Sequence, residues 1–134
     1  MTELKYGHWV TNKLKPVIAI GFVYEIENTI DNKKYIGKKQ LFFRQTKKPL
    51  KGFKRKRRSI TNSDWEVYTG SNNQLNADIK RLGKDKFKFT ILQWCLTKTD
   101  LSYAELKHIV DAQALWLPNY YNSWIYCRIR NNRK

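Results

Sequence analysis

Residues 17–37 read VIAIGFVYEIENTIDNKKYIG, and this stretch decides the expected fold. Its first part, residues 17–26, is apolar at most positions, which is typical of a central strand covered on both faces. Residues 28–32 then supply asparagine and aspartate, which favour turns. The run KYIG at 34–37 follows as a short returning strand. The stretch therefore predicts an antiparallel β-hairpin.

Each arm of this hairpin carries one tyrosine, Tyr24 on the first arm and Tyr35 on the second. Residues that face each other in an antiparallel pair have numbers with a constant sum, and a two- or four-residue loop makes that sum odd. The two phenols are therefore expected on one face, opposite or diagonal to each other. Tyrosine is also a good strand residue, and aromatic pairs across strands stabilise sheets, so the pattern alone also fits a purely structural pair.

The chain after this hairpin predicts two helices and a third strand. A helix is expected up to Leu82, because apolar residues recur there at helical spacing, Ser71 or Asn72 can cap it and Gly83 ends it. Residues 87–92 alternate like a half-buried strand. A second helix is expected at about 102–117, closed by Pro118. The expected class is α+β, with a small three-stranded antiparallel sheet flanked by helices.

One domain accounts for the 134 residues of the chain. Residues 1–16 are interpreted as an N-terminal extension and residues 17–134 as the domain itself. Residues 38–62 lack a clear period and contain Pro49 and Gly52. They predict a long basic loop, with a short helix considered near 41–46.

The formal net charge is +16, which favours a polyanion as the partner. Much of the excess lies between residues 38 and 58, where there is no acidic residue at all. A solvated basic loop is the alternative interpretation, but the size of the excess favours DNA. The expected DNA contacts are Lys47, Lys48, Lys51, Lys54, Arg55, Lys56, Arg57 and Arg58.

Two classes of protein are not expected from the sequence. No apolar run reaches the roughly 18 residues of a membrane helix, and the first residues lack the layout of a secretory signal. A cytoplasmic protein that does not bind membranes is therefore expected.

The runs GFVY at 21–24 and YIG at 35–37 resemble the two-part signature of the GIY-YIG nuclease superfamily, the first half in variant form. A helix, a strand, a second helix bearing Glu105 and then Asn122 follow in the order of that family. The stretch 64–71 resembles a compact phage-borne branch of it. The resemblance covers about 21–122 and implies a GIY-YIG-like fold that hydrolyses DNA phosphodiester bonds. For a phage-encoded protein, the compartment would be the cytoplasm of a bacterial host.

The resemblance also implies roles for individual residues. Glu105 would hold one divalent ion, Mg²⁺ or Mn²⁺, Tyr24 would deprotonate or orient the attacking water, and Tyr35 would hydrogen-bond the phosphate or the water. Asn122 would help to organise the site.

Basic residues would complete the site that the resemblance implies. Arg44 is nearest in spacing to an arginine of the family, with Arg55, Arg57 and Arg58 as alternatives. Gly70 falls near the place of a histidine often found in the family. Lys38 and Lys39 are therefore hypothesised to be catalytic and to take part of its role.

Alternatives remain open at this stage. Ser102 and Glu105 have the spacing of a helix capping box, and Asn122 suits a turn after an aromatic pair. The main rival function is a non-catalytic, basic nucleic-acid-binding protein. Target recognition would come from loops or from a homodimer.

Overall fold

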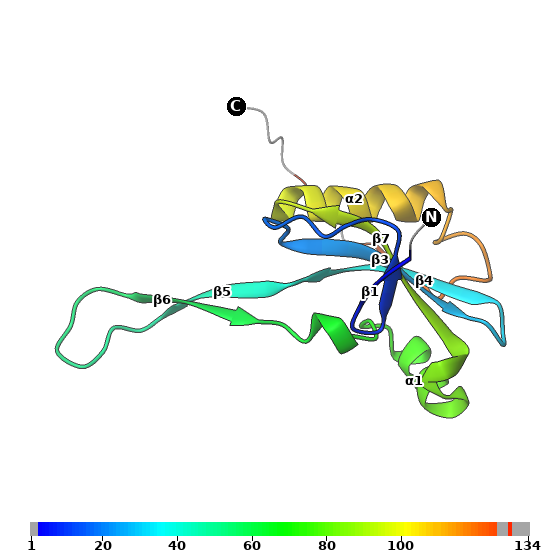
Figure 1. Cartoon of the computed structure of the whole chain (residues 1–134), viewed down its shortest axis with the longest axis horizontal. Coiled ribbons are helices and arrows are strands. Elements are labelled where there is room, and N and C mark those ends of the chain that lie inside the picture. The colour runs from blue at the N-terminus through cyan, green and yellow to red at the C-terminus, as the bar shows by residue number, and fades with distance from the viewer. Residues whose placement is uncertain (1–2, 126–128, 130–134) are drawn as a thin grey trace.

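The computed structural model describes residues 3–125 and 129 of the chain. Its main sheet has five strands in the order β1-β2-β7-β3-β4 (Figure 1). Neighbouring strands run antiparallel, except that β2 is parallel to β7. The strands are β1 (Leu4–Tyr6), β2 (Trp9–Thr11), β3 (Gly21–Asn28), β4 (Lys33–Gln40) and β7 (Phe87–Cys95).

The expected α+β class is confirmed, but the expected three-stranded antiparallel sheet is wrong. The sheet is mixed, and its two additional strands come from residues 4–11, inside the stretch interpreted as an extension. Trp9 of β2 is fully buried, and its indole donates a hydrogen bond to the carbonyl of Trp65. Strands of three residues are too short to show an alternating pattern, which is why the sequence did not reveal them.

The hairpin of β3 and β4 has the expected odd register. Tyr24 pairs with Gly37, and Ile26 pairs with Tyr35. The two tyrosines are therefore diagonal neighbours on one face, with ring centroids 6.2 Å apart. Because β4 is the outer strand of the sheet, side chains from both of its faces reach the same open edge.

The pairing of β3 with β7 contains a bulge beside Tyr24. Val23 pairs with Gln93 but Tyr24 pairs with Ile91, so Leu92 is an extra residue in β7. The extra residue keeps Ile91 and Trp94 on the same face of the sheet, where both join the aromatic core.

Two helices lie on opposite sides of the main sheet (Figure 1). The first, α1 (Asn73–Leu82), is confirmed: the Asn72 side chain accepts a hydrogen bond from the backbone of Leu75, and Gly83 ends the helix with a φ of 97°. The second, α2 (Lys98–Asp111), begins and ends earlier than expected. The short 3-10 turns are η1 (Trp65–Val67) and η2 (Lys84–Lys86).

The cap of α2 is Thr97, whose hydroxyl accepts a hydrogen bond from the backbone N–H of Asp100. The alternative interpretation of Ser102 and Glu105 as a capping box is therefore wrong, because both residues lie inside the helix. Glu105 therefore does not cap the helix, and the structural role that competed with metal binding is removed.

The basic stretch 38–62 is not a loop. After the end of β4, it forms a separate two-stranded sheet of β5 (Phe42–Lys47) and β6 (Arg57–Asn62). These strands make an arm that extends from the body in Figure 1. The short helix considered near 41–46 is likewise wrong, because those residues lie mostly in β5. No helix among the described residues is long and apolar enough to cross a membrane.

Candidate active site

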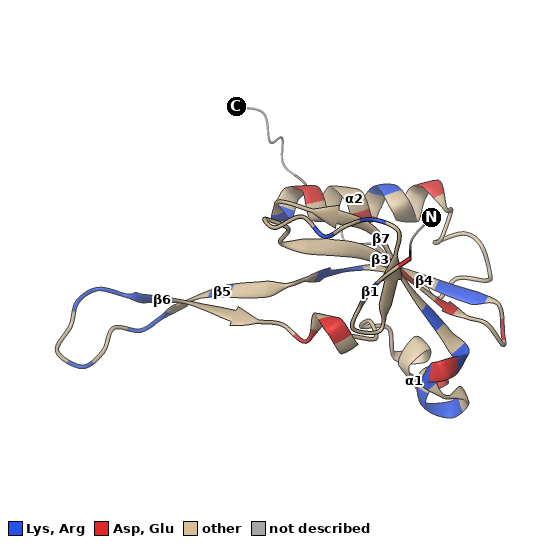
Figure 2. Cartoon of the chain, in the orientation of Figure 1, with Lys and Arg blue, Asp and Glu red and all other residues tan. Residues whose placement is uncertain are grey.

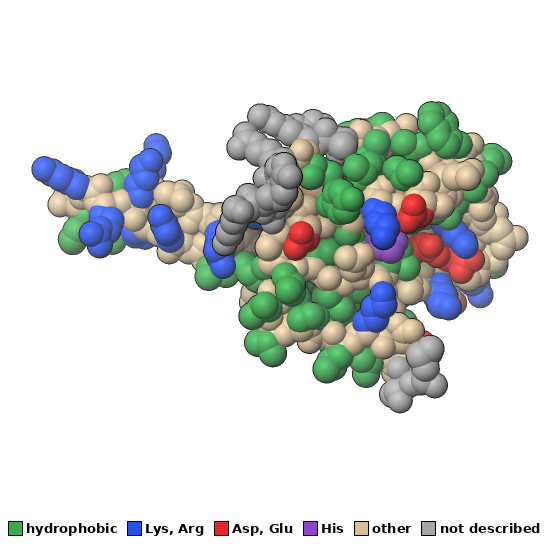
Figure 3. Space-filling view, turned by 90° about the horizontal axis from the view of Figure 1, so that it is seen from above, with side chains coloured by type: hydrophobic (Ala, Val, Ile, Leu, Met, Phe, Trp, Pro, Cys, Tyr) green, Lys and Arg blue, Asp and Glu red, His purple; other side chains and the backbone are tan. Residues whose placement is uncertain are grey.

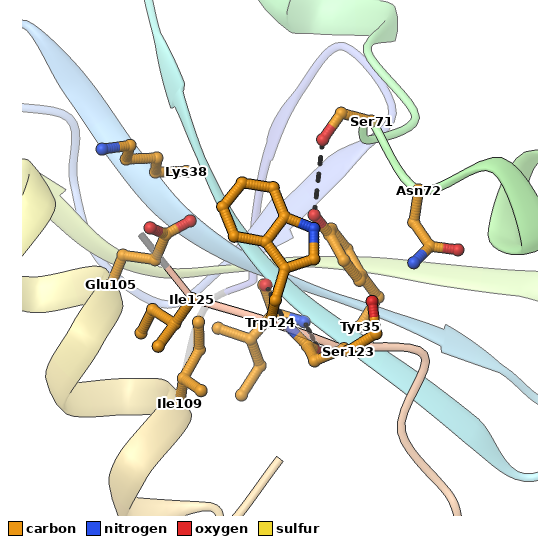
Figure 4. Close-up of a pocket in the computed structure, with 11 residues that line it drawn as sticks. Tyr35, Lys38, Ser71, Asn72, Glu105, Ile109, Ser123, Trp124 and Ile125 are labelled. Carbon is orange, nitrogen blue, oxygen red and sulfur yellow. Dashed lines mark hydrogen bonds between the residues drawn. The ribbon is translucent and has the colours of Figure 1, made fainter. Parts of the chain in front are cut away.

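A pocket of about 420 Å³ lies at the open edge of β4. Tyr35 reaches it from one face of the sheet and Lys38 from the other, together with Glu105 of α2. Figure 4 shows Glu105 and Lys38 on one side and Tyr35 with Ser71 on the other. The lining residues are Tyr35, Ile36, Lys38, Ser71, Asn72, Glu105, Ile109, Asn122, Ser123, Trp124 and Ile125.

Glu105 is the carboxylate of this pocket. Burial raises its pKa, and the positive charge of Lys38 opposes that shift. The Lys38 ammonium donates a hydrogen bond to the hydroxyl of Ser102 at 2.9 Å. Among the described residues, none forms a hydrogen bond or an ion pair with the Glu105 carboxylate. The carboxylate is therefore half-buried and still available to a ligand.

Tyr35 presents its hydroxyl to the same pocket. The hydroxyl lies 3.4 Å from that of Ser71 (Figure 4). Burial raises the pKa of Tyr35, and the negative charge of Glu105 raises it further, although the contact with Ser71 acts in the opposite direction. The phenol is therefore neutral at neutral pH and can donate a hydrogen bond.

Tyr24 does not line the pocket: it packs beside Tyr35, with only 1% of its surface exposed. Burial raises its pKa well above 10.0, and neighbouring Tyr35, Tyr68 and Glu105 raise it further. A phenol with a raised pKa stays protonated at neutral pH. Tyr24 is therefore better suited to donate a hydrogen bond to a neighbouring group than to remove a proton.

Two glycines make room for the Tyr24 hydroxyl. A Cβ atom at Gly37 would lie 2.5 Å from that oxygen. A Cβ atom at Gly70 would lie 3.4 Å from it, and Gly70 also has a φ of +84°. The sequence singled out Gly70 only for the histidine that it lacks, whereas the structure places it against both tyrosines.

Lys39 lies on the same face of the sheet as Tyr24, but its ammonium group already has partners. Its ammonium is 3.0 Å from an Asp64 carboxylate oxygen and 3.9 Å from the centre of the Tyr68 ring. Of the two lysines suggested as catalytic, only Lys38 lines the pocket.

Asn122 holds the last described segment against β4. Its side-chain oxygen accepts a hydrogen bond from the Ile36 N–H at 3.0 Å, and its side-chain nitrogen donates to the Ile36 carbonyl at 2.8 Å. The Tyr121 N–H adds a hydrogen bond to the Lys34 carbonyl at 2.7 Å. The amide thus acts as a partner for the outer strand and places residues 122–125 along the pocket.

Arg44 does not reach the pocket. It lies on β5 and lines a separate depression with Ile20 and Leu96. The other suggested arginines, Arg55, Arg57 and Arg58, lie on the exposed arm. Among the described lining residues, Lys38 is the one cation.

Sequence reasoning missed the pocket side chains of Ser71 and Trp124, and it missed Ser102, which contacts the pocket residue Lys38. Ser71 and Ser102 were noted only as helix caps, whereas they contact Tyr35 and Lys38. Trp124 lies in the pocket with 73% of its surface exposed. The signal available in the sequence was the position of Trp124, two residues after Asn122.

The arm carries the cations that the sequence assigned to DNA. All eight are exposed, and no acidic residue lies between 40 and 62 (Figure 2). The side chains form blue clusters along the arm in Figure 3. The arm is therefore a strongly positive, solvated surface, separate from the pocket.

Comparison with known proteins gives one match. The model of a family described as "Putative endonuclease segE, GIY-YIG domain" matches residues 8–125. The match includes both half-motifs, Glu105 and Asn122. No curated protein and no solved structure matches the chain.

Proposed function

The chain belongs to this segE-type GIY-YIG endonuclease family, and on that premise we propose that it is a divalent-metal-dependent endonuclease of DNA. The observation that carries the proposal is the unpaired Glu105 carboxylate, which shares a pocket with Tyr35 and Lys38. A module that only binds nucleic acid has no use for such a carboxylate, because it repels phosphate.

The pocket fits a single Mg²⁺ or Mn²⁺ ion. Mg²⁺ prefers oxygen ligands and is commonly held by one or two carboxylates plus waters and substrate phosphate. Glu105 supplies one carboxylate, and the described residues contain no cluster of three metal-binding side chains. A one-metal site completed by water and by the DNA phosphate is therefore the arrangement that we propose.

The bound ion would neutralise charge on the phosphate and stabilise the leaving oxygen. A water oxygen forms a bond to phosphorus while the bond between phosphorus and the leaving oxygen breaks, and the leaving oxygen gains a proton from solvent that balances the one the attacking water loses. Lys38 is placed to attract a phosphate oxygen. The neutral phenol of Tyr35 donates a hydrogen bond to the phosphate or to the water, and Tyr24 supports Tyr35 from below.

The arm would bind the DNA and hold it close to this pocket. Neutralised phosphates release condensed counterions, so a cluster of exposed cations binds duplex DNA without sequence preference. We assign the arm to binding and the pocket to cleavage.

A plasmid assay tests the proposal. Supercoiled plasmid is incubated with the protein in Mg²⁺, in Mn²⁺ or in EDTA, next to the Glu105→Gln variant. Nicked or linear plasmid is expected only for the wild type with metal. Cleavage in EDTA would contradict the metal role, and tight binding without cleavage in either metal would favour the non-catalytic alternative.

A further inference from the structure

The tip of the basic arm carries two exposed apolar side chains. Leu50 is 51% exposed and Phe53 is 70% exposed. The N–H of Phe53 donates to the carbonyl of Leu50 at 2.9 Å, which closes a tight turn, and Gly52 within it has a φ of +89°. This turn holds both side chains at the very end of the arm, where no other described element covers them.

The arm is long enough to reach across DNA. The eight steps from residue 42 to residue 50 rise by about 3.3 Å each where the chain is extended, so the tip lies up to about 26 Å from the base of the arm. Its two strands pair with each other along their length, and the arm stands clear of the main sheet in Figure 1. Figure 3 shows apolar side chains between the blue clusters of this arm.

Cations lie on both faces of the arm. Lys47 is paired with Arg57 on one face, whereas Arg58, opposite Thr46, lies on the other face. A groove of duplex DNA presents phosphates on two sides, and its major groove admits a two-stranded ribbon. Charge on both faces therefore matches a groove better than a flat anionic surface such as a membrane, which would meet one face only.

We propose that the arm bends the DNA that it binds: the ribbon enters a groove, and Leu50 and Phe53 wedge between base pairs. Apolar side chains that other proteins wedge into a base step from the minor groove unstack it partly, at a cost of a few kcal/mol, and kink the duplex by about 20–90°, and we expect a kink in this range here. The wedge removes two apolar side chains from water, and the kink brings more phosphates to the cations of the arm. A second copy of the chain is a poor occupant for the tip, because two arms of like charge repel each other.

The inference rests on the proposed function for its ligand, duplex DNA, and the test measures bending without cleavage. A DNA fragment of about 150 bp, near the persistence length of DNA, carries long complementary single-stranded ends and a fluorophore pair. End-to-end looping is followed by energy transfer with the full-length protein in EDTA. A kink in the middle part of the fragment brings the two ends together and speeds looping, and for a protein that binds all along the fragment we expect an average gain on the order of tenfold.

The variant with Leu50→Ser and Phe53→Ser should lose this gain. It removes no charge, so the variant should still bind DNA in a salt-dependent way, with a slope of log affinity against log salt that is flatter only by the few phosphates that the kink brings to the arm. Ile60→Ser is the matched control, because Ile60 is an apolar residue of the arm, 68% exposed, that lies away from the tip. This control should loop DNA as fast as the wild type.

Three outcomes would overturn the inference: no gain in looping by the wild type at saturating protein, an equal loss in the Ile60→Ser control, or tighter tip-dependent binding to anionic lipid vesicles than to DNA. The plasmid assay separates the two proposals. A protein that cleaves DNA without bending it refutes the wedge alone, and one that bends DNA without cleaving it refutes the nuclease alone.

Discussion

The pocket and the arm place their ionisable groups in opposite surroundings. In the pocket, burial raises the pKa values of Glu105 and Tyr35, and the nearest cation is a single lysine. On the arm, Arg44 and the eight lysines and arginines assigned to DNA remain in water. Buried groups respond strongly to a ligand or a change in protonation, whereas exposed charges act at longer range and are screened by salt. The difference predicts that cleavage and binding can be removed separately.

Glu105→Gln should have the largest effect. Loss of the carboxylate should lower the single-turnover cleavage rate by at least ~10²–10³-fold, the range for losing one strong electrostatic contact to the transition state. Affinity for DNA in EDTA should change little, because the arm is intact. A variant that cuts at the wild-type rate would contradict the metal assignment.

The same variant should also be more stable than the wild type near neutral pH. The folded state raises the pKa of Glu105, so the ionised carboxylate destabilises the fold above that pKa, and the cost disappears as the pH falls through it. Thermal unfolding should therefore show a higher midpoint for Glu105→Gln at about pH 7, and the gap should close toward about pH 4. A constant gap would mean that burial of the charge is not its cause.

Tyr35→Phe and Tyr24→Phe should each slow cleavage without unfolding the domain. The rings and their packing remain and only the hydroxyls are lost. Proton transfer or its orientation by such a group is worth typically ~10²–10⁴-fold. Tyr103→Phe is the control, because Tyr103 is an exposed phenol on α2 outside the lining of the pocket. Full activity in both pocket variants would leave the tyrosines as a purely structural cross-strand pair.

The arm is expected to set the salt dependence of binding. Five changes to glutamine, at Lys54, Arg55, Lys56, Arg57 and Arg58, should flatten the slope of log affinity against log salt. Five phosphate contacts at about 0.9 each give a change of as much as about 4.5. The loss of affinity should be similar on every DNA sequence, and the cleavage rate at saturating DNA should stay unchanged.

A second set of five exposed lysines on the body, changed to glutamine, controls for net charge. These are Lys80, Lys84, Lys86, Lys88 and Lys107. The control should flatten the slope less than the arm variant does. A lower saturated rate in the arm variant would instead place one of its arginines in the active site.

The contrast between the two regions also explains what the sequence could and could not predict. The tyrosine pair follows from hairpin register, and α1 follows from helical spacing with Asn72 and Gly83 at its ends. Both depend on local geometry. The arm was taken for a loop because its solvated strands bury neither face and so show no alternation of apolar residues.

The pocket depends on contacts between residues distant in the chain. That β4 is the outer strand, and that Asn122 pairs with its Ile36, follows from the assembled sheet. The start of α2 was misplaced because a threonine, Thr97, and a serine, Ser102, are both residues that commonly cap the start of a helix. Glu105 was found by resemblance, and its accessibility became clear only when the cap role was removed.

Trp124 should affect substrate affinity more than the chemical step. Stacking of a base on an aromatic ring is worth about 1–3 kcal/mol, so Trp124→Ala is expected to raise KM roughly tenfold or more, with a small change in kcat. Trp116→Ala is the matched control, since Trp116 is 82% exposed but does not line the pocket. A change confined to kcat would mean that Trp124 acts on the reacting phosphate and not on a base.

The smallest effects should come from one substitution made in each region. Gly70 and Gly52 have φ values of +84° and +89°, so alanine costs each a similar strain of about 1–2 kcal/mol. At Gly52 the new Cβ has nothing within 4 Å, whereas at Gly70 it lies 3.4 Å from both the Tyr24 hydroxyl and Tyr35 Cε2.

Gly70→Ala should therefore lower both the unfolding midpoint and the cleavage rate, by a few-fold in rate. Gly52→Ala should leave both unchanged, because its strain falls on a two-stranded arm that is separate from the main sheet. Thermal unfolding and single-turnover cleavage of the pair make the comparison. If Gly52→Ala slowed cleavage at saturating DNA as much as Gly70→Ala, the shape of the arm would contribute to the chemical step, and binding and cleavage would not be separable functions of the two regions.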